Sequence, residues 1–252
     1  MKNKQRLKSP QTVLTKRRDM ESALSVIIPC HNESFHIGPL IFEINKALLA
    51  FSKEYEIIVV DDCSDDMTGE IARFHGAKVI SNRARSHMGK GFALRTAFEH
   101  ASGEFIVTID AEGMHDPGEI VKLISPILRE EADLVIGSRF SKYARIRPYA
   151  ITRWKRTANY LINLLIRIIT GAKFSDSQSG FRAYRRKVLE NLQIFSKGYE
   201  IETEILYKSM RAGYTCKEVP ITLRPRQGRY VPNFRESLRI FEETLDFRFR
   251  GR

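Results

Sequence analysis

Short apolar runs rich in β-branched residues recur along the first half of the chain, and each is followed by a polar or glycine-containing segment. Such runs are typical of strands that are buried on both faces of a parallel sheet. The segments between them have the 3.6-residue period of amphipathic helices. We expect strands over residues 25–29, 56–60, 78–80, 104–109 and 133–136, and helices over residues 36–51, 68–74, 91–100 and 117–129.

The alternation of strand and helix predicts an α/β fold with an open, doubly wound and mostly parallel sheet. In such sheets a ligand binds outside the carboxyl ends of the strands, so the residues that follow each strand are the candidate functional groups. Many of them are acidic, and because parallel strands end at one edge, we expect these side chains to lie together. They are Glu33 after the first strand, Asp61, Asp62, Asp65 and Asp66 after the second, and Asp110 and Glu112 after the fourth.

Carboxylates gathered at one edge repel each other unless a cation or a hydrogen-bonded ligand offsets their charge. A divalent metal is the simplest such cation, and oxygen ligands suit Mg²⁺ or Mn²⁺, with a diphosphate completing the coordination shell. Asp110 and Glu112 can both reach one ion if the chain turns between them. For Asp65 and Asp66 we favour a simpler role as caps of the following helix.

Two other features near the strand ends have less specific patterns. Gly89, Lys90 and Gly91 precede a predicted helix and form either a phosphate cradle or a tight turn, because they lack the full spacing of a dinucleotide-binding or P-loop motif. The six histidines share no metal-ligand spacing and are expected at the surface, with His115 the exception because of its position near the acidic residues.

The composition is that of an ordinary globular protein of 252 residues, which excludes disordered and collagen-like classes. The formal net charge of +12 favours an anionic partner, which is a nucleic acid, a phosphorylated substrate or an anionic membrane surface. Residues 1–20 hold seven basic side chains and one acidic one, which predicts a flexible basic arm. Residues 134–175 hold nine basic side chains and no acidic one, so we expect an anionic ligand to contact this stretch.

No apolar run is long enough to span a membrane, and the N-terminus lacks the apolar core of a signal peptide. Three widely spaced cysteines without a CxxC pair fit neither a disulfide framework nor a zinc site and favour a reducing compartment. We therefore expect a cytoplasmic protein that is soluble or peripheral on the membrane. Residues 153–169 and 233–249 are amphipathic, and for residues 153–169 membrane contact and packing on the domain core both explain the pattern.

Six segments in order resemble glycosyltransferase family 2 with the GT-A fold, and most closely its polyprenyl-phosphate (dolichyl-phosphate) mannosyl- and glucosyltransferases. The segments are SVIIPCHNES, EIIVVDDCSDDMTGE, GKGFALRTAFEHASGEFIVTIDAE, GSRF, SDSQSGFRAYRRKVLE and CKEVPITLRPRQG. The resemblance covers about residues 23–240 and implies a C-terminal segment on the acceptor side of the fold. We expect a basic N-terminal arm over residues 1–22, a GT-A domain over residues 23–232 and an amphipathic C-terminal helix over residues 233–252.

The resemblance also implies roles for individual residues. The donor would bind at Pro29, Glu33, Asp61, Asp62, Lys90, Asp110 and Ala111. The metal, Mg²⁺ or Mn²⁺, would bind at Asp110 and Glu112. The acceptor would bind at Arg139, Arg153, Arg156, Gln178, Ser179 and Arg226, and the expected catalytic residues are Asp110, Glu112, Arg139 and Asp176.

The sequence departs from the family pattern at three places. Glu112 stands where the family usually has Asp, and Met114 stands where many lipid-phosphate synthases have a Gln that can reach the metal. These two changes bear on metal preference. Tyr230 and Val231 replace a common Ser-Lys pair, which removes one expected phosphate contact near the acceptor.

The sequence therefore predicts metal-dependent, inverting transfer of a hexose from a GDP- or UDP-linked sugar to a polyprenyl phosphate at the cytoplasmic face of a membrane. One alternative is a family member with a soluble or glycan acceptor, which the missing Ser-Lys pair favours and the basic stretch opposes. Another is a non-catalytic basic module that binds nucleic acid or anionic lipid. Acidic strand ends argue against nucleic acid, because without a metal they repel phosphate.

Overall fold

The computed structural model describes residues 23–51, 53–82, 86–146, 153–225 and 242, with the backbone alone for residues 153–155. The predicted arm over residues 1–22 lies outside the described residues. So does the predicted C-terminal helix over residues 233–252, apart from residue 242.

The described residues form a seven-stranded sheet in the order β3-β2-β1-β4-β7-β5-β8. All neighbouring strands are parallel except β7, which runs antiparallel to both β4 and β5. The five strands expected from the sequence are confirmed as β1 to β5, with small shifts at their ends, whereas β7 and β8 carry no long apolar run and were not expected. The strands are β1 (Leu24–Cys30), β2 (Tyr55–Asp61), β3 (Lys78–Ser81), β4 (Phe105–Thr108), β5 (Leu134–Ser138), β7 (Arg182–Arg185) and β8 (Cys216–Pro220).

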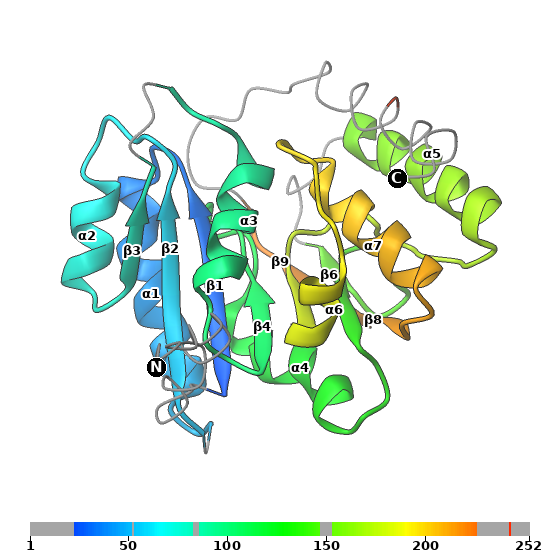
Figure 1. Cartoon of the computed structure of the whole chain (residues 1–252), viewed down its shortest axis with the longest axis horizontal. Helices are drawn as coiled ribbons and strands as arrows, with labels where there is room; N and C mark the ends of the chain where they lie inside the picture. The colour runs from blue at the N-terminus through cyan, green and yellow to red at the C-terminus, as the bar shows by residue number, and fades with distance from the viewer. Residues whose placement is uncertain (1–22, 52, 83–85, 147–152, 226–241, 243–252) are drawn as a thin grey trace, which may run out of the picture.

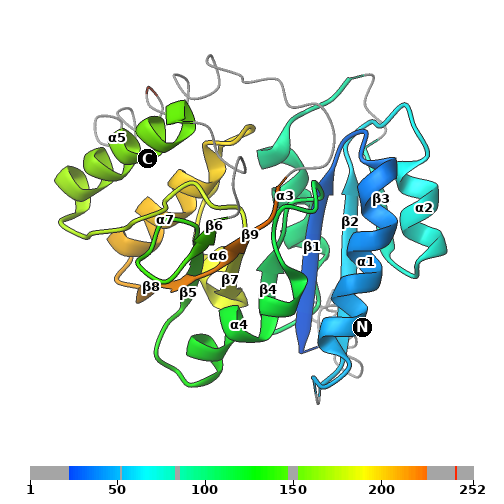
Figure 2. The same ribbon diagram turned by 180° about the vertical axis from the view of Figure 1, so that it is seen from behind.

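Helices cover both faces of this sheet (Figures 1 and 2). One face carries α1 (Ser34–Leu48), α2 (Thr68–Phe74) and α4 (Ile120–Leu128), which the short 3₁₀ turn η2 (Pro117–Glu119) precedes. The other face carries α3 (Lys90–His100), α6 (Arg186–Asn191) and α7 (Ile201–Arg211), and α5 (Arg153–Thr170) packs beside α7. A separate two-stranded ribbon joins β6 (Arg145–Ile146) to β9 (Thr222–Leu223).

The core explains why the strand sequences are continuously apolar. Side chains alternate between the two faces of a strand, so both faces of a covered sheet need apolar residues. In β1, Val26 and Ile28 pack in the cluster that includes α1 and α4, whereas Ile27 packs in the cluster that includes α3 and α7. All three side chains are fully buried.

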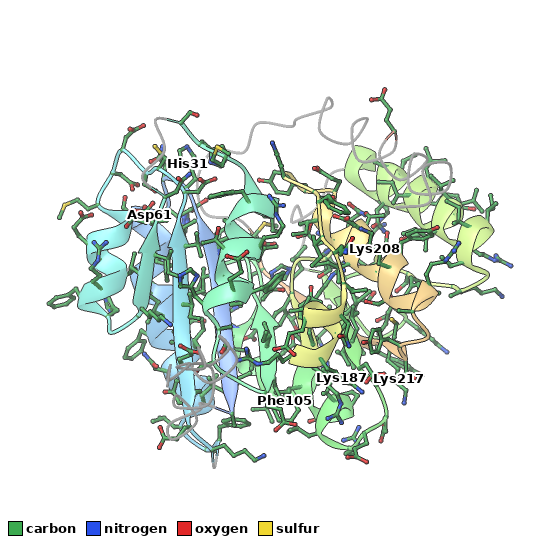
Figure 3. All side chains as sticks on the ribbon, viewed as in Figure 1. His31, Asp61, Phe105, Lys187, Lys208 and Lys217 are labelled. Carbon is green, nitrogen blue, oxygen red and sulfur yellow. The ribbon has the colours of Figure 1, made fainter. Side chains whose placement is uncertain are left out.

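The strand register brings the candidate residues to one edge. Cys30 of β1 aligns with Asp61 of β2, and Asp61 aligns with Ser81 of β3. Figure 3 shows His31 and Asp61 at this carboxyl edge, and Phe105, which begins β4, at the opposite end of the sheet. The expectation that the groups following these strands share an edge is confirmed.

Candidate functional site

An ion-paired cluster lies at the middle of the carboxyl edge. Lys90 begins α3, and its Nζ lies 2.5 Å from Oδ1 of Asp110 and 2.6 Å from Oε1 of Glu202, near the start of α7. The chain turns over residues 111–113 after Asp110, as a shared metal site with Glu112 requires, and Gly113 supplies the left-handed conformation with φ of 69°. Glu202 was not among the expected site residues.

The electrostatics of this cluster favour charged Asp110 and Lys90. Burial alone would raise the pKa of Asp110, but the neighbouring Lys90 charge outweighs it and lowers that pKa to about 2. Burial opposes the charge on Lys90, yet Asp110 and Glu202 raise its pKa above the ordinary lysine value. His115 lies nearby, and burial lowers its pKa to about 4, so its imidazole is neutral at pH 7.

Gly180 forms the wall beside this cluster. A Cβ atom at this position would lie 2.6 Å from Asp110 Oδ2 and 2.6 Å from Lys90 Nζ. A side chain at this position would therefore have to displace the carboxylate or the ammonium, which explains the glycine in the loop before β7. Thr108 Oγ1 donates a 2.8 Å hydrogen bond to the carbonyl of Gly180 and fixes this loop against β4.

A second ion pair joins the end of β5 to the loop before β7. The guanidinium of Arg139 donates to both oxygens of Asp176, through Nε at 2.6 Å and Nη2 at 2.8 Å, and its backbone N–H donates to Oδ2 at 3.0 Å. Asp176 is fully buried. Glu218 of β8 in turn accepts from the backbone N–H groups of Ser175 and Asp176. Residues far apart in the sequence thus hold Arg139 in one orientation.

The expected acceptor residues Gln178 and Ser179 lie in the same loop and are engaged within it. Gln178 Nε2 donates to Thr203 Oγ1 at 2.6 Å, and Ser179 is fully buried. Arg182, also fully buried, donates to the carbonyl oxygens of Ser177, Ser179 and Glu202. This network ties the loop to α7, so Gln178 and Ser179 border the ion-paired cluster without lining the basic cavity described below.

The carboxylate of Asp62 is used to hold the loop before α3. It accepts from the backbone N–H groups of Met88 and Gly89, and from Asn82 Nδ2. His87 Nδ1 lies 2.7 Å from the same carboxylate, and Asp62 is 1% exposed. All of these contacts are made within the protein and do not test binding of the donor. The donor-binding role of Asp62 therefore stays a prediction.

The other expected donor residues lie along the same edge. Asp61 ends β2 and accepts a 3.2 Å hydrogen bond from the backbone N–H of Ser64. Glu33 lies directly before α1, and its carboxylate is 2.7 Å from His36 Nδ1. Pro29 pairs with Val60 near the end of β1. Ala111 is buried in the turn after Asp110.

The structure favours the tight-turn interpretation of the glycines around Lys90. Gly89 adopts φ of 99°, and a Cβ atom there would lie 2.6 Å from the carbonyl oxygen of Lys197. A Cβ atom at Gly91 would lie 2.5 Å from the carbonyl oxygen of Ser196. The glycines therefore let residues 196–198 approach the start of α3 closely.

The expected helix-capping role is found in part, at Asp66. Its carboxylate accepts from the backbone N–H groups of Thr68 and Ser34, which are the first residues of α2 and α1. Burial opposes ionisation of Asp66, but these hydrogen bonds outweigh it and lower the pKa to about 2. Asp65 is exposed, and its backbone N–H donates to Asn32.

A basic cavity of about 650 Å³ lies between α5 and the segment after β5. Four cationic residues line it, together with apolar rings and side chains, and its lining contains no carboxylate. The cationic residues are Arg139, Arg156, Arg167 and Lys173, and the larger apolar ones are Phe140, Ile146, Tyr160, Leu164 and Phe174. Of the expected acceptor residues, Arg139 and Arg156 thus come together, whereas Arg226 and the side chain of Arg153 lie outside the described residues.

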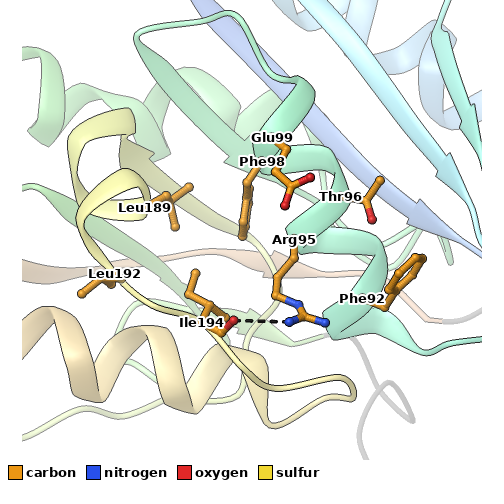
Figure 4. Close-up of a pocket in the computed structure, with 8 residues that line it drawn as sticks. All are labelled: Phe92, Arg95, Thr96, Phe98, Glu99, Leu189, Leu192 and Ile194. Atoms are coloured by element: carbon orange, nitrogen blue, oxygen red, sulfur yellow. Dashed lines mark hydrogen bonds between the residues drawn. The ribbon is translucent and has the colours of Figure 1, made fainter. Parts of the chain in front are cut away.

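A smaller cavity of about 380 Å³ lies between α3 and the segment around α6 (Figure 4). Phe92, Phe98 and Leu189 are among its lining residues, and Arg95 Nη1 donates to the carbonyl of Ile194 at 3.4 Å. None of the residues expected at the site lines this cavity.

Comparisons with known proteins identify the family and the fold. The chain is 34% identical over 205 residues to the glycosyltransferase AglJ of Haloferax volcanii, covering 81% of this chain and 64% of AglJ, so it spans less than two thirds of that relative. It is 31% identical over 229 residues to the polyprenol monophosphomannose synthase of Mycolicibacterium smegmatis, covering 86% of this chain and 82% of the synthase.

A solved structure with the same fold is glucosyl-3-phosphoglycerate synthase from Mycobacterium tuberculosis in complex with Mn²⁺, UDP-glucose and phosphoglyceric acid. The TM-score is 0.72 at 25% identity, over 90% of this chain and 79% of the synthase. The fold is thus the GT-A glycosyltransferase fold, as expected from the sequence. The sequence model of glycosyl transferase family 2 matches residues 25–193, and the chain belongs to this family.

The site contains residues that the sequence did not single out. Glu202 and Glu218 complete the two ion-paired networks, and Gly180 leaves room for the first of them. The only sequence signal for Glu202 was the spacing of three acidic residues, Glu200, Glu202 and Glu204, which are all buried in and before α7. Buried charged residues are rare unless they are paired, and the pairing appears only in the folded chain.

Proposed function

We propose that this chain transfers a hexose from a nucleotide sugar to a polyprenyl phosphate, with a divalent metal, while docked on a membrane surface. The observation that carries the proposal is the basic cavity. Arg139, Arg156, Arg167 and Lys173 offer positive charge to a phosphate, and the apolar lining suits the first units of a prenyl chain. A ligand with one anionic end and one apolar end matches both kinds of lining residue.

Family membership and the solved structures support the donor half of the proposal. The mycobacterial synthase has been solved with UDP and Mn²⁺ or Mg²⁺. In the present chain Asp110 and Glu112 offer oxygen ligands on one turn. Lys90 is in close contact with Oδ1 of Asp110, which leaves Oδ2 of the same carboxylate for a metal. Among the described residues no group of three or more His, Cys, Asp or Glu side chains forms a ready metal site. The donor diphosphate would supply further ligands.

Each residue then has a definable task in the transfer. Asp110 and Glu112 would hold the metal, which when bound offsets the charge of the departing nucleotide diphosphate. Lys90 keeps Asp110 charged, and Glu202 holds the Lys90 ammonium beside it. Arg139, held by Asp176, screens the anionic acceptor from the anionic donor. A phosphate acceptor is already anionic at neutral pH, so no strong general base is needed, and a single in-line attack would invert the anomeric centre.

The direct test of acceptor class is binding to the full chain by calorimetry, with short-chain prenyl phosphate, the matching prenol and inorganic phosphate as probes. We expect the prenyl phosphate to bind at least tenfold more tightly than either partial probe, and Arg167→Glu to weaken it. Equal affinity for inorganic phosphate and prenyl phosphate would instead support a soluble phosphorylated acceptor. Phosphoglyceric acid, which the mycobacterial synthase binds, is such a molecule.

The exposed side of α5 supports membrane docking. Among residues 156–170 of this helix, whose side chains the structure describes, Asn159, Ile162, Asn163 and Ile166 are buried and pack on the domain. The apolar residues Leu161, Leu164 and Ile168 instead remain 45%, 40% and 64% exposed, as does Tyr160 at 65%. Packing on the core therefore does not explain these side chains. Within the described residues, no helix has the length and apolar character needed to cross a bilayer.

We predict that the double variant Leu161→Ser, Ile168→Ser no longer co-sediments with vesicles containing anionic lipid, whereas the wild type does so at low salt. The exposed apolar side chains and the basic residues around them act together at such a surface. Leu49→Ser is the matched control, because Leu49 is 81% exposed but lies at the end of α1. A wild type that stays in the supernatant at low salt would remove the membrane from the proposal.

The donor assignment predicts different consequences at two adjacent carboxylates. Asp62→Ala should lower the free energy of unfolding by about 1–3 kcal/mol, because it leaves the half-buried N–H groups of Met88 and Gly89 without this acceptor. Asp61→Ala should raise the donor KM by about tenfold with a smaller effect on stability. Denaturant unfolding and initial rates measure the two effects. An unchanged donor KM in Asp61→Ala would show that the nucleoside binds elsewhere.

A further inference from the structure

His115 is a buried histidine whose ring nitrogens both lack a hydrogen-bond partner among the described residues. It follows the turn after Asp110, forms an isolated antiparallel bridge with Leu223, and is 3% exposed. Its ring stacks on Phe181 with 5.3 Å between the ring centroids, which fixes the plane of the imidazole. Buried polar groups in folded proteins nearly always have a partner, so this ring is placed where a ligand can complete it.

The nearest polar group fits a shared metal ion. His115 Nδ1 lies 4.0 Å from Asp110 Oδ2, too far for a hydrogen bond. Metal bonds to imidazole nitrogen and carboxylate oxygen are about 2.1 Å long, so two ligands on one ion stand about 3.0 Å apart when adjacent and about 4.2 Å apart when opposite. The observed separation falls within that range. Lys90 contacts the other oxygen of the carboxylate, so Oδ2 is the atom directed to the histidine.

The charge of the cluster also admits a cation. Asp110 and Glu202 share the single ammonium of Lys90, which leaves one negative charge between them. A divalent ion beside Oδ2 would therefore meet a net negative group. Met114, next to His115 in the chain, offers only a thioether, which is a poor ligand for Mg²⁺ or Mn²⁺.

We propose that His115 is a nitrogen ligand of the donor metal and binds it together with Asp110 Oδ2. This inference rests on the proposed function only for the presence of a metal–nucleotide complex, and it holds for any acceptor. Imidazole suits later transition metals better than Mg²⁺, so the site should prefer Mn²⁺ to Mg²⁺.

Pulsed electron paramagnetic resonance of Mn²⁺ bound to the full chain with UDP tests this contact without an activity assay. We expect modulation from a directly bound ¹⁴N nucleus, replaced by ¹⁵N coupling when the protein carries ¹⁵N-labelled histidine. His115→Gln should abolish the coupling and weaken Mn²⁺ binding by about 10- to 100-fold. His100→Gln is the matched control, because His100 is exposed at the end of α3, and it should keep the wild-type spectrum.

Three results would overturn the proposal. Wild-type protein that binds Mn²⁺ and UDP without nitrogen coupling excludes His115 as a ligand and leaves the donor site standing. Coupling that persists in folded His115→Gln assigns the nitrogen to another residue. Failure of the wild type to bind Mn²⁺ in the presence of UDP would remove both this proposal and the metal part of the proposed function. Because the labelled wild type is informative alone, an unfolded variant does not block the test.

Discussion

Replacing Asp110 with Asn is expected to reduce hexosyl transfer by about a hundredfold or more while the chain stays folded. The change removes a charged oxygen ligand at the place where the donor diphosphate is expected, and losing one such electrostatic contact typically lowers kcat by about 10²- to 10³-fold. Lys90 keeps its 2.6 Å contact with Glu202, so its charge is not left buried and unpaired. Initial rates with saturating Mn²⁺, together with thermal unfolding of the same sample, measure the two parts of the expectation.

Asp65→Asn is the matched control for this variant. Asp65 lies after β2 at the same edge of the sheet and is exposed. Its backbone N–H, not its carboxylate, makes the hydrogen bond to Asn32 Oδ1. Its side chain should therefore be dispensable for turnover. A folded Asp110→Asn protein with near-normal turnover would contradict the assignment of the metal and diphosphate to this turn.

Asp176→Ala is expected to produce the largest loss of stability among the site variants, about 3–5 kcal/mol. Asp176 is fully buried and accepts three hydrogen bonds from Arg139, two of them from the guanidinium. Removing Asp176 leaves the guanidinium of Arg139, whose side chain is only 20% exposed, without its carboxylate partner. Denaturant unfolding of the wild type and the variant gives the difference directly.

Comparison of the single variant with a double variant separates the effect of the ion pair from that of simple packing. The double variant Asp176→Ala, Arg139→Met carries no unpaired charge and should be more stable than Asp176→Ala alone. Glu190→Gln removes an exposed partner of Arg186 and should leave stability unchanged. If Asp176→Ala were as mild as Glu190→Gln, the Arg139–Asp176 pair would not be the element that holds the acceptor side together.

The part of the fold that the sequence predicts is the part with local signals. Runs of β-branched residues predict strands β1 to β5, and the 3.6-residue period of the apolar positions predicts the helices between them. β7 has the sequence RAYR and pairs antiparallel between β4 and β5, so its place depends on partners distant in the chain. The helix α7 was not expected either, because its first turns bury Glu202 and Glu204, against the usual amphipathic pattern.

In the candidate site, too, the residues with a local sequence signal were predicted and the contacts between distant segments were not. Asp61 and Asp110 were found because they follow strands, and strand ends are a local feature. The contacts of Lys90 with Glu202, and of Ser175 and Asp176 with Glu218, join separate segments, so no spacing in the sequence reveals them. Asp62 shows the opposite effect, because its position predicts a ligand contact while its oxygens already hold the loop before α3.

The most direct test of the proposed function is a transfer assay with the full chain, Mn²⁺ and polyprenyl phosphate, in which radiolabelled UDP- and GDP-linked hexoses are screened in turn. With one of these donors, label should move into the organic phase, and omission of polyprenyl phosphate or substitution of the matching polyprenol should abolish this transfer. Label that stays in water with every donor and polyprenyl phosphate, but moves onto a soluble phosphorylated acceptor, would contradict the lipid-phosphate assignment and identify the basic cavity as the site for that acceptor.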